Sequence, residues 1–106
     1  MISDTFPIST RLRTLLGAFH PETLEPDQEE PDAHAYMNGW TDRDRRDVEH
    51  ELHALVSSEN KVAEWLGQRI GDDVRDEIAA REFLRSLALF VVDPNKPQPD
   101  VGEILL

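Results

Sequence analysis

The stretch TDRDRRDVEHELHALVSS, residues 41–58, carries the clearest helix pattern in this chain. Four apolar residues recur in it at offsets 0, 4, 7 and 8: Val48, Leu52, Leu55 and Val56. This spacing places them on one face of a helix. Thr41 and, three residues later, Asp44 predict a capping box at the helix start, with Asp in the place of the usual Glu. The stretch therefore predicts a long amphipathic helix with one buried face.

Three further segments, at residues 8–19, 59–70 and 78–92, show the same helical spacing of apolar residues. We expect Ser9 and Ser58 to cap the first two and Gly71 to end the second. Gly67, within the second, indicates that a neighbouring helix comes close there. The expected core positions of these segments are Ile8, Leu12, Leu15, Leu16, Phe19, Val62, Trp65, Leu66, Ile70, Phe83, Leu84, Leu87, Ala88 and Val91.

The predicted fold is all-α, a compact bundle of four principal helices plus short extra turns. At 106 residues the chain fits a single domain, residues 1–106, with its core at about residues 8–92. A proline-rich tail follows at residues 94–106, and its last three residues, Ile-Leu-Leu, either pack back on the bundle or pair with another chain.

The net charge of the chain limits the classes of molecule that the protein can bind. The chain holds 22 Asp and Glu against 11 Lys and Arg, a formal net charge of −11. Such a field repels phosphate backbones and anionic membranes and favours a basic protein, so we expect neither nucleic-acid nor membrane binding.

The absence of cysteine excludes disulfides and thiolate zinc sites. The N-terminus MISDTFPIST lacks the basic and apolar parts of a signal peptide, so we expect a cytoplasmic protein.

One run of eleven residues, 22–32, concentrates this charge and holds no base. It supplies −6 of the net charge and contains prolines that argue against a long regular element. The run is either a solvated loop or a surface suited to a cationic partner. Its carboxylates are Glu22, Glu25, Asp27, Glu29, Glu30 and Asp32.

Two aromatic residues follow the run in the segment AYMNGW, residues 35–40. That segment fits one or two helical turns ended by Gly39, or an irregular anchor. Tyr36 and Trp40 either complete the small core or, exposed, anchor an interface. Phe6, in another irregular segment, has the same two interpretations.

Patterns of catalytic or metal-binding residues are weak. The stretch EHELH places His50 and His53 three residues apart, whereas the zinc protease motif needs histidines four apart. The acidic run lacks the glycine of an EF-hand calcium loop, and no glycine-rich phosphate loop is present. We therefore expect that the protein is not an enzyme and that it holds no cofactor and no resident metal. A small metal-dependent enzyme that uses His50 and His53 is the third-ranked alternative.

With the helices placed, the order of short motifs resembles a family of small immunity proteins from bacterial contact-dependent growth inhibition systems. The resemblance spans roughly residues 8–92, and the chain departs from the family's opening pattern at Pro21, Glu22 and Thr23. The matching residues are Leu12, Leu15, Leu16, Gly17, Phe19 and His20, then Glu51, Leu52 and Leu55, then Arg81, Glu82, Phe83, Leu84 and Arg85.

This resemblance implies an all-helical protein that binds one cognate toxin domain and neutralises it inside the producing cell. We expect the protein itself to be a monomer or a weak dimer. Such a toxin is often a nuclease and hence often basic, in agreement with the net charge of −11. On this hypothesis the six acids attract the toxin, and Tyr36 or Trp40 supplies a desolvated anchor. The alternative is a helical adaptor or antitoxin-like regulator that self-associates through the C-terminal Ile-Leu-Leu.

Overall fold

The computed structural model of the chain describes residues 8–20, 33–58, 61–93 and 95–105. Within these ranges it is all-α, and the only β feature is an isolated bridge between Val74 and Leu105. Four principal helices and two short turns confirm the predicted architecture. Their bounds are α1 Thr10–Gly17, α2 Ala33–Tyr36, α3 Asp42–Val56, α4 Val62–Ile70, α5 Glu77–Val92 and the 3-10 turn η2 Val101–Glu103.

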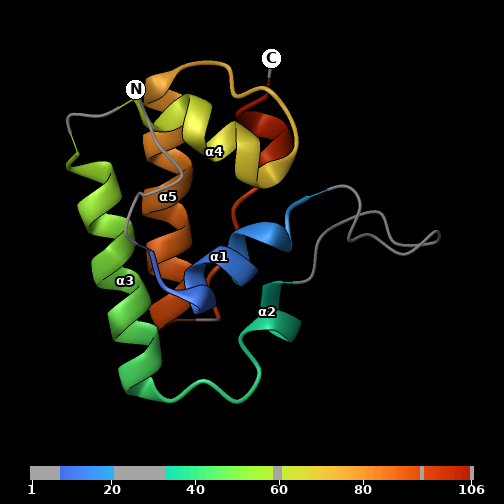
Figure 1. Cartoon of the computed structure of the whole chain (residues 1–106). Coiled ribbons are helices and arrows are strands. Elements are labelled where there is room, and N and C mark those ends of the chain that lie inside the picture. The colour runs from blue at the N-terminus through green and yellow to red at the C-terminus, as the bar shows by residue number, and fades with distance from the viewer. Residues whose placement is uncertain (1–7, 21–32, 59–60, 94, 106) are drawn as a thin grey trace, which may run out of the picture.

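The two longest helices, α3 and α5, run antiparallel side by side and form the frame of the bundle (Figure 1). Helix α4 packs on α5, and α1 packs on both α3 and α4 (Figure 1). The predicted apolar stripes meet between these helices, because each helix buries the face on which its apolar residues recur. All the expected core residues named above are buried except Ile8 and Val56, which are partly buried against the others.

Two of the predicted N-terminal helix caps are confirmed. The Leu12 amide donates to Ser9 Oγ at 3.2 Å, and Ser9 is the N-cap of α1. Thr41 N donates to Asp44 Oδ2 at 3.0 Å, while Asp44 N donates to Thr41 Oγ1 at 3.1 Å, which completes the capping box of α3. The cap predicted at Ser58 is wrong. Helix α4 starts after Lys61, which makes no side-chain cap.

Helix α4 is capped instead by a carboxylate from another helix. Glu77, in the first turn of α5, accepts hydrogen bonds from Val62 N at 2.7 Å and from Ala63 N. These amides belong to the first turn of α4, where no backbone acceptor is available. A carboxylate there also interacts favourably with the helix dipole. Glu51 of α3 acts similarly on α1, since it accepts from both the amide and the hydroxyl of Ser9.

The C-terminal ends of the two frame helices are bound by arginines in a reciprocal way. Arg45, near the start of α3, donates to the carbonyl of Val91 at the end of α5 at 3.1 Å. Arg81, near the start of α5, donates to the carbonyl of Val56 at the end of α3. Each guanidinium satisfies a carbonyl that has no partner within its own helix. The two contacts fix the antiparallel register of α3 and α5.

The C-terminal segment folds back onto the helices. Gln98 Oε1 accepts from Ala33 N at 2.9 Å and so caps α2. Ile104 is only 6% exposed, and its carbonyl accepts from Arg75 N at 2.6 Å. Leu105 is partly buried, and Leu106 lies outside the described residues. Ile104 is thus occupied within its own chain, which counts against self-association through the terminal Ile-Leu-Leu.

Glycines 67 and 71 control the exit from α4. Gly71 ends the helix in the left-handed region, at φ 75°, as its predicted C-cap role requires. A Cβ atom there would also lie 2.4 Å from the ring of His20. At Gly67 a Cβ would lie 2.8 Å from the carbonyl oxygen of Asp72. The close approach predicted at Gly67 therefore comes from the following loop and not from a neighbouring helix.

We expect Glu77→Ala to lower the free energy of unfolding by about 1–3 kcal/mol, because it leaves two amides of α4 without an acceptor. Urea unfolding followed by circular dichroism measures this. The control is Asp47→Ala, which removes an exposed carboxylate of α3 and should change stability by no more than about 0.5 kcal/mol. Equal losses in the two variants would contradict the capping role.

Candidate functional site

A shallow groove of about 460 Å³ separates α1 from the segment that contains α2. Tyr36 and Trp40 line one part of it, so the structure brings the two sequence-predicted aromatic residues together. Both rings are partly buried and pack against the core, which leaves part of each ring open to the groove. The remaining lining residues come from α1 and its cap: Ser9, Thr10, Arg11 and Thr14.

The position of the two rings is fixed by the residues between and before them. Met37 is buried and its carbonyl accepts from Trp40 N at 3.1 Å. Gly39, at φ 86°, allows the tight turn that returns Trp40 toward α1. The Gln98 cap on Ala33 holds the start of α2. The rings therefore belong to an anchored turn and form a preorganised apolar surface.

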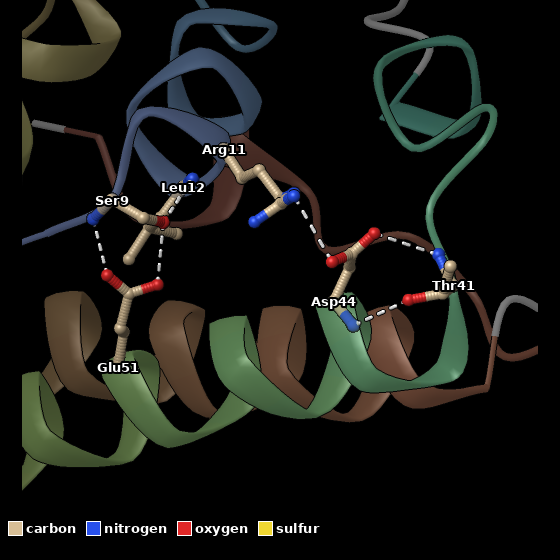
Figure 2. Close-up of polar contacts among 6 residues, drawn as sticks. All are labelled: Ser9, Arg11, Leu12, Thr41, Asp44 and Glu51. Atoms are coloured by element: carbon tan, nitrogen blue, oxygen red, sulfur yellow. Dashed lines mark hydrogen bonds and ion pairs between the residues drawn. The ribbon is translucent and has the colours of Figure 1, made fainter.

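The charged residue of the groove, Arg11, is paired. Figure 2 shows its guanidinium reaching across to Asp44 at the start of α3, with Arg11 Nη2 3.2 Å from Asp44 Oδ1. The Thr41 amide, which donates to the Asp44 carboxylate, lowers the pKa of Asp44, and the nearby Arg11 lowers it further. Asp44 is thus ionised at neutral pH and offsets the positive charge of Arg11 at the groove.

A polar cluster at the start of α1 keeps this side of the groove in place. Glu51 of α3 binds Ser9 through both carboxylate oxygens (Figure 2). The distance from Ser9 Oγ to Glu51 Oε2 is 2.8 Å. Glu51 is one of the residues on which the family resemblance depends, and here its contacts are structural. Arg81, another of them, binds the end of α3.

The six carboxylates of the acidic run, proposed as partner-binding residues, lie outside the described part of the chain, as does Phe6. The described ranges resume at Ala33, three residues before Tyr36. In sequence the run thus immediately precedes the segment that carries both groove rings.

A second groove, of about 670 Å³, lies beside α4 and the loop that follows it. Its charged lining residues are all carboxylates: Glu64, Asp72 and Asp73. Sequence reasoning did not single them out, because they are distributed over a helix and a loop. They extend negative charge onto the described surface.

The two histidines of α3 are exposed. His53 Nε2 lies 3.9 Å from Glu49 Oε2, one turn earlier on the same helix. Within the described ranges, no three side chains of His, Asp or Glu come together as metal ligands would. Nothing in the described geometry therefore favours the metal-dependent alternative.

Sequence reasoning missed the α1 side of the groove. Thr10, Arg11 and Thr14 occupy the polar face of an amphipathic helix, and no local pattern separates such residues from an ordinary solvated face. Only the position of α2 beside them creates a groove.

Comparison of the chain with protein-family models, with curated proteins and with solved structures gave no match. In the part of the chain that the structure describes, no helix combines the length and apolarity needed to cross a bilayer.

We expect the contribution of Asp44 to stability to depend on pH. Because its pKa is lowered in the folded state, its stabilising contribution is present above the ordinary value of 3.8 and is lost as pH falls through the lowered folded-state pKa. Wild type should be more stable than Asp44→Asn at pH 7, and the difference should shrink on acidification below about pH 4. Urea unfolding at a series of pH values measures it. A difference that stays constant from pH 7 to the acid limit would contradict the assignment.

Proposed function

We propose that this protein is an immunity protein that binds one basic toxin domain stoichiometrically and blocks it, with no chemistry of its own. The observation that carries the proposal is the distribution of charge. More than half of the net charge of −11 falls in one run without a base, directly before the two rings of the groove. The order of motifs that resembles the contact-dependent growth inhibition immunity family supports the same function.

The run and the groove have different tasks in this proposal. The six carboxylates attract a cationic surface from a distance and raise the association rate, an effect that salt screens. Tyr36 and Trp40 provide the area that the partner desolvates, and aromatic residues are prominent among energetically dominant interface residues. A partner Lys or Arg placed over either ring would gain a cation–π contact.

The pairing of Arg11 with Asp44 makes the groove compatible with a cationic partner. An unpaired guanidinium at this position would repel incoming Lys or Arg side chains. The Asp44 carboxylate, 3.2 Å from Arg11, offsets that charge. The carboxylates beside α4 extend the negative field over another part of the described surface.

The charge part of the proposal is tested with the cognate toxin domain, which the proposal expects to be basic and to be encoded by a neighbouring gene. Neutralising all six acids of the run to Asn or Gln should lower the association rate constant about tenfold or more at low ionic strength and flatten its salt dependence. Stopped-flow fluorescence measures both. The control for general loss of charge neutralises six exposed carboxylates elsewhere and should have a much smaller effect; these are Asp42, Asp47, Glu64, Asp72, Asp73 and Glu103. An association rate constant that the six substitutions leave unchanged would show that the acidic run does not contribute to association.

The groove part is tested by Trp40→Ala, which removes a large ring at the proposed contact. We expect the dissociation constant for the same toxin domain to rise about 10- to 100-fold, mostly through faster dissociation. Isothermal titration calorimetry measures the affinity, and circular dichroism verifies that the variant is folded. His50→Ala, which removes an exposed ring on α3, should leave affinity unchanged. An unchanged affinity in folded Trp40→Ala would place the contact elsewhere.

A further inference from the structure

The outer face of α5 exposes large apolar side chains. Ile78 is 70% exposed, Leu89 53% and Val92 39%. In the described part of the chain these are the exposed large hydrophobic residues. The opposite face of α5 is buried in the core and includes Leu84 and Leu87.

The exposed residues follow a regular order along the helix. Ile78, Glu82, Arg85, Leu89 and Val92 are separated by four, three, four and three residues. This is the a/d repeat by which two helices pack along a seam. All five side chains are exposed, and two of them, Glu82 and Leu89, also line a groove of about 790 Å³ between α5 and the C-terminal segment at residues 96–104. We refer to these five residues as the α5 seam.

Four of the five residues of the α5 seam face one another when two copies lie antiparallel, and Val92 lies beyond them, opposite position 75. A two-fold axis midway between Glu82 and Arg85 places Glu82 of one copy opposite Arg85 of the other. The same axis places Ile78 opposite Leu89. Each of these layers then occurs twice, as two-fold symmetry requires. In a parallel pair, Glu82 would face Glu82 and Arg85 would face Arg85, and such like-charge contacts are unfavourable.

The two charged residues of the α5 seam are not engaged within the described part of the chain. The ion pair that α5 makes along its own length is Arg81 with Glu77, at 3.8 Å. Across the described ranges, neither Glu82 nor Arg85 forms an ion pair. Both charges are therefore available to a second copy.

We propose that a second copy of this chain docks on the α5 seam to form an antiparallel, two-fold symmetric dimer. The apolar layers supply the attraction, and the Glu82–Arg85 layers select the antiparallel register. Since α5 has 16 residues, the contact is small and the dimer is reversible. The α5 seam shares no residue with the Tyr36–Trp40 groove, so this inference is independent of the immunity function.

Sedimentation velocity of the full chain tests the proposal, at about 0.15 M salt to screen the repulsion between the two acidic chains. The wild type should shift with concentration from the 12.1 kDa chain mass toward twice that value. Glu82→Arg alone and Arg85→Glu alone should each raise the dimer dissociation constant about tenfold or more, because like charges then face each other. The double variant Glu82→Arg with Arg85→Glu should restore the dimer.

Mixing the two single variants tests the facing of Glu82 and Arg85 most directly. An equimolar mixture of the two single variants should form a heterodimer, since one chain then carries two arginines and the other two glutamates at facing positions. Asp73→Arg, which changes the net charge by as much as Glu82→Arg does but in an exposed loop, should dimerise like the wild type. A wild type that stays monomeric up to about 1 mM would overturn the proposal. Single variants that dimerise as well as the wild type, or a double variant that does not recover, would also overturn it.

Discussion

Arg45 and Arg81 hold the two longest helices together at their ends, each binding a terminal carbonyl of the other helix. An antiparallel pair can make this reciprocal contact only in one register, because each guanidinium must reach the last turn of its neighbour. The apolar stripes of α3 and α5 face each other in that register and enclose the core. Burial supplies most of the stabilisation, whereas the charged end contacts decide which arrangement of the helices is adopted.

The same device is repeated in the smaller helices. Glu51 binds the cap of α1 and Glu77 caps α4, so the starts of α1 and α4 are each fixed by a carboxylate from a frame helix. This fixes α1, against which the Tyr36–Trp40 turn forms its groove. The proposed binding surface is therefore rigid on the side of the groove. The acidic run joins two fixed points, His20 after α1 and Ala33 at the start of α2.

Local patterns in the sequence predicted most of the fold and little of the site. The helices, the buried stripes and the caps at Ser9 and Thr41 follow from spacing within one turn or a few turns of a helix. The start of α4 was misjudged because its acceptor, Glu77, lies in another helix. Phe90, which is buried, was not predicted as a core residue because it lies off the apolar stripe of Phe83, Leu84, Leu87 and Val91; its ring packs edge-on against that of His34, with the centroids 4.9 Å apart. Thr10 and Arg11 become groove residues only through the placement of α2, which no local pattern encodes.

Cross-helix contacts of charged side chains, and not charge in general, fix the frame of α3 and α5. Two adjacent arginines of α3 allow a direct comparison, since Arg45 binds the Val91 carbonyl and Arg46 is exposed. The measurement is the free energy of unfolding of Arg45→Met and Arg46→Met in urea. The prediction is a loss of about 1–3 kcal/mol for Arg45→Met. For Arg46→Met the predicted change in the free energy of unfolding is no more than about 0.5 kcal/mol. Equal effects of the two substitutions would contradict the claim.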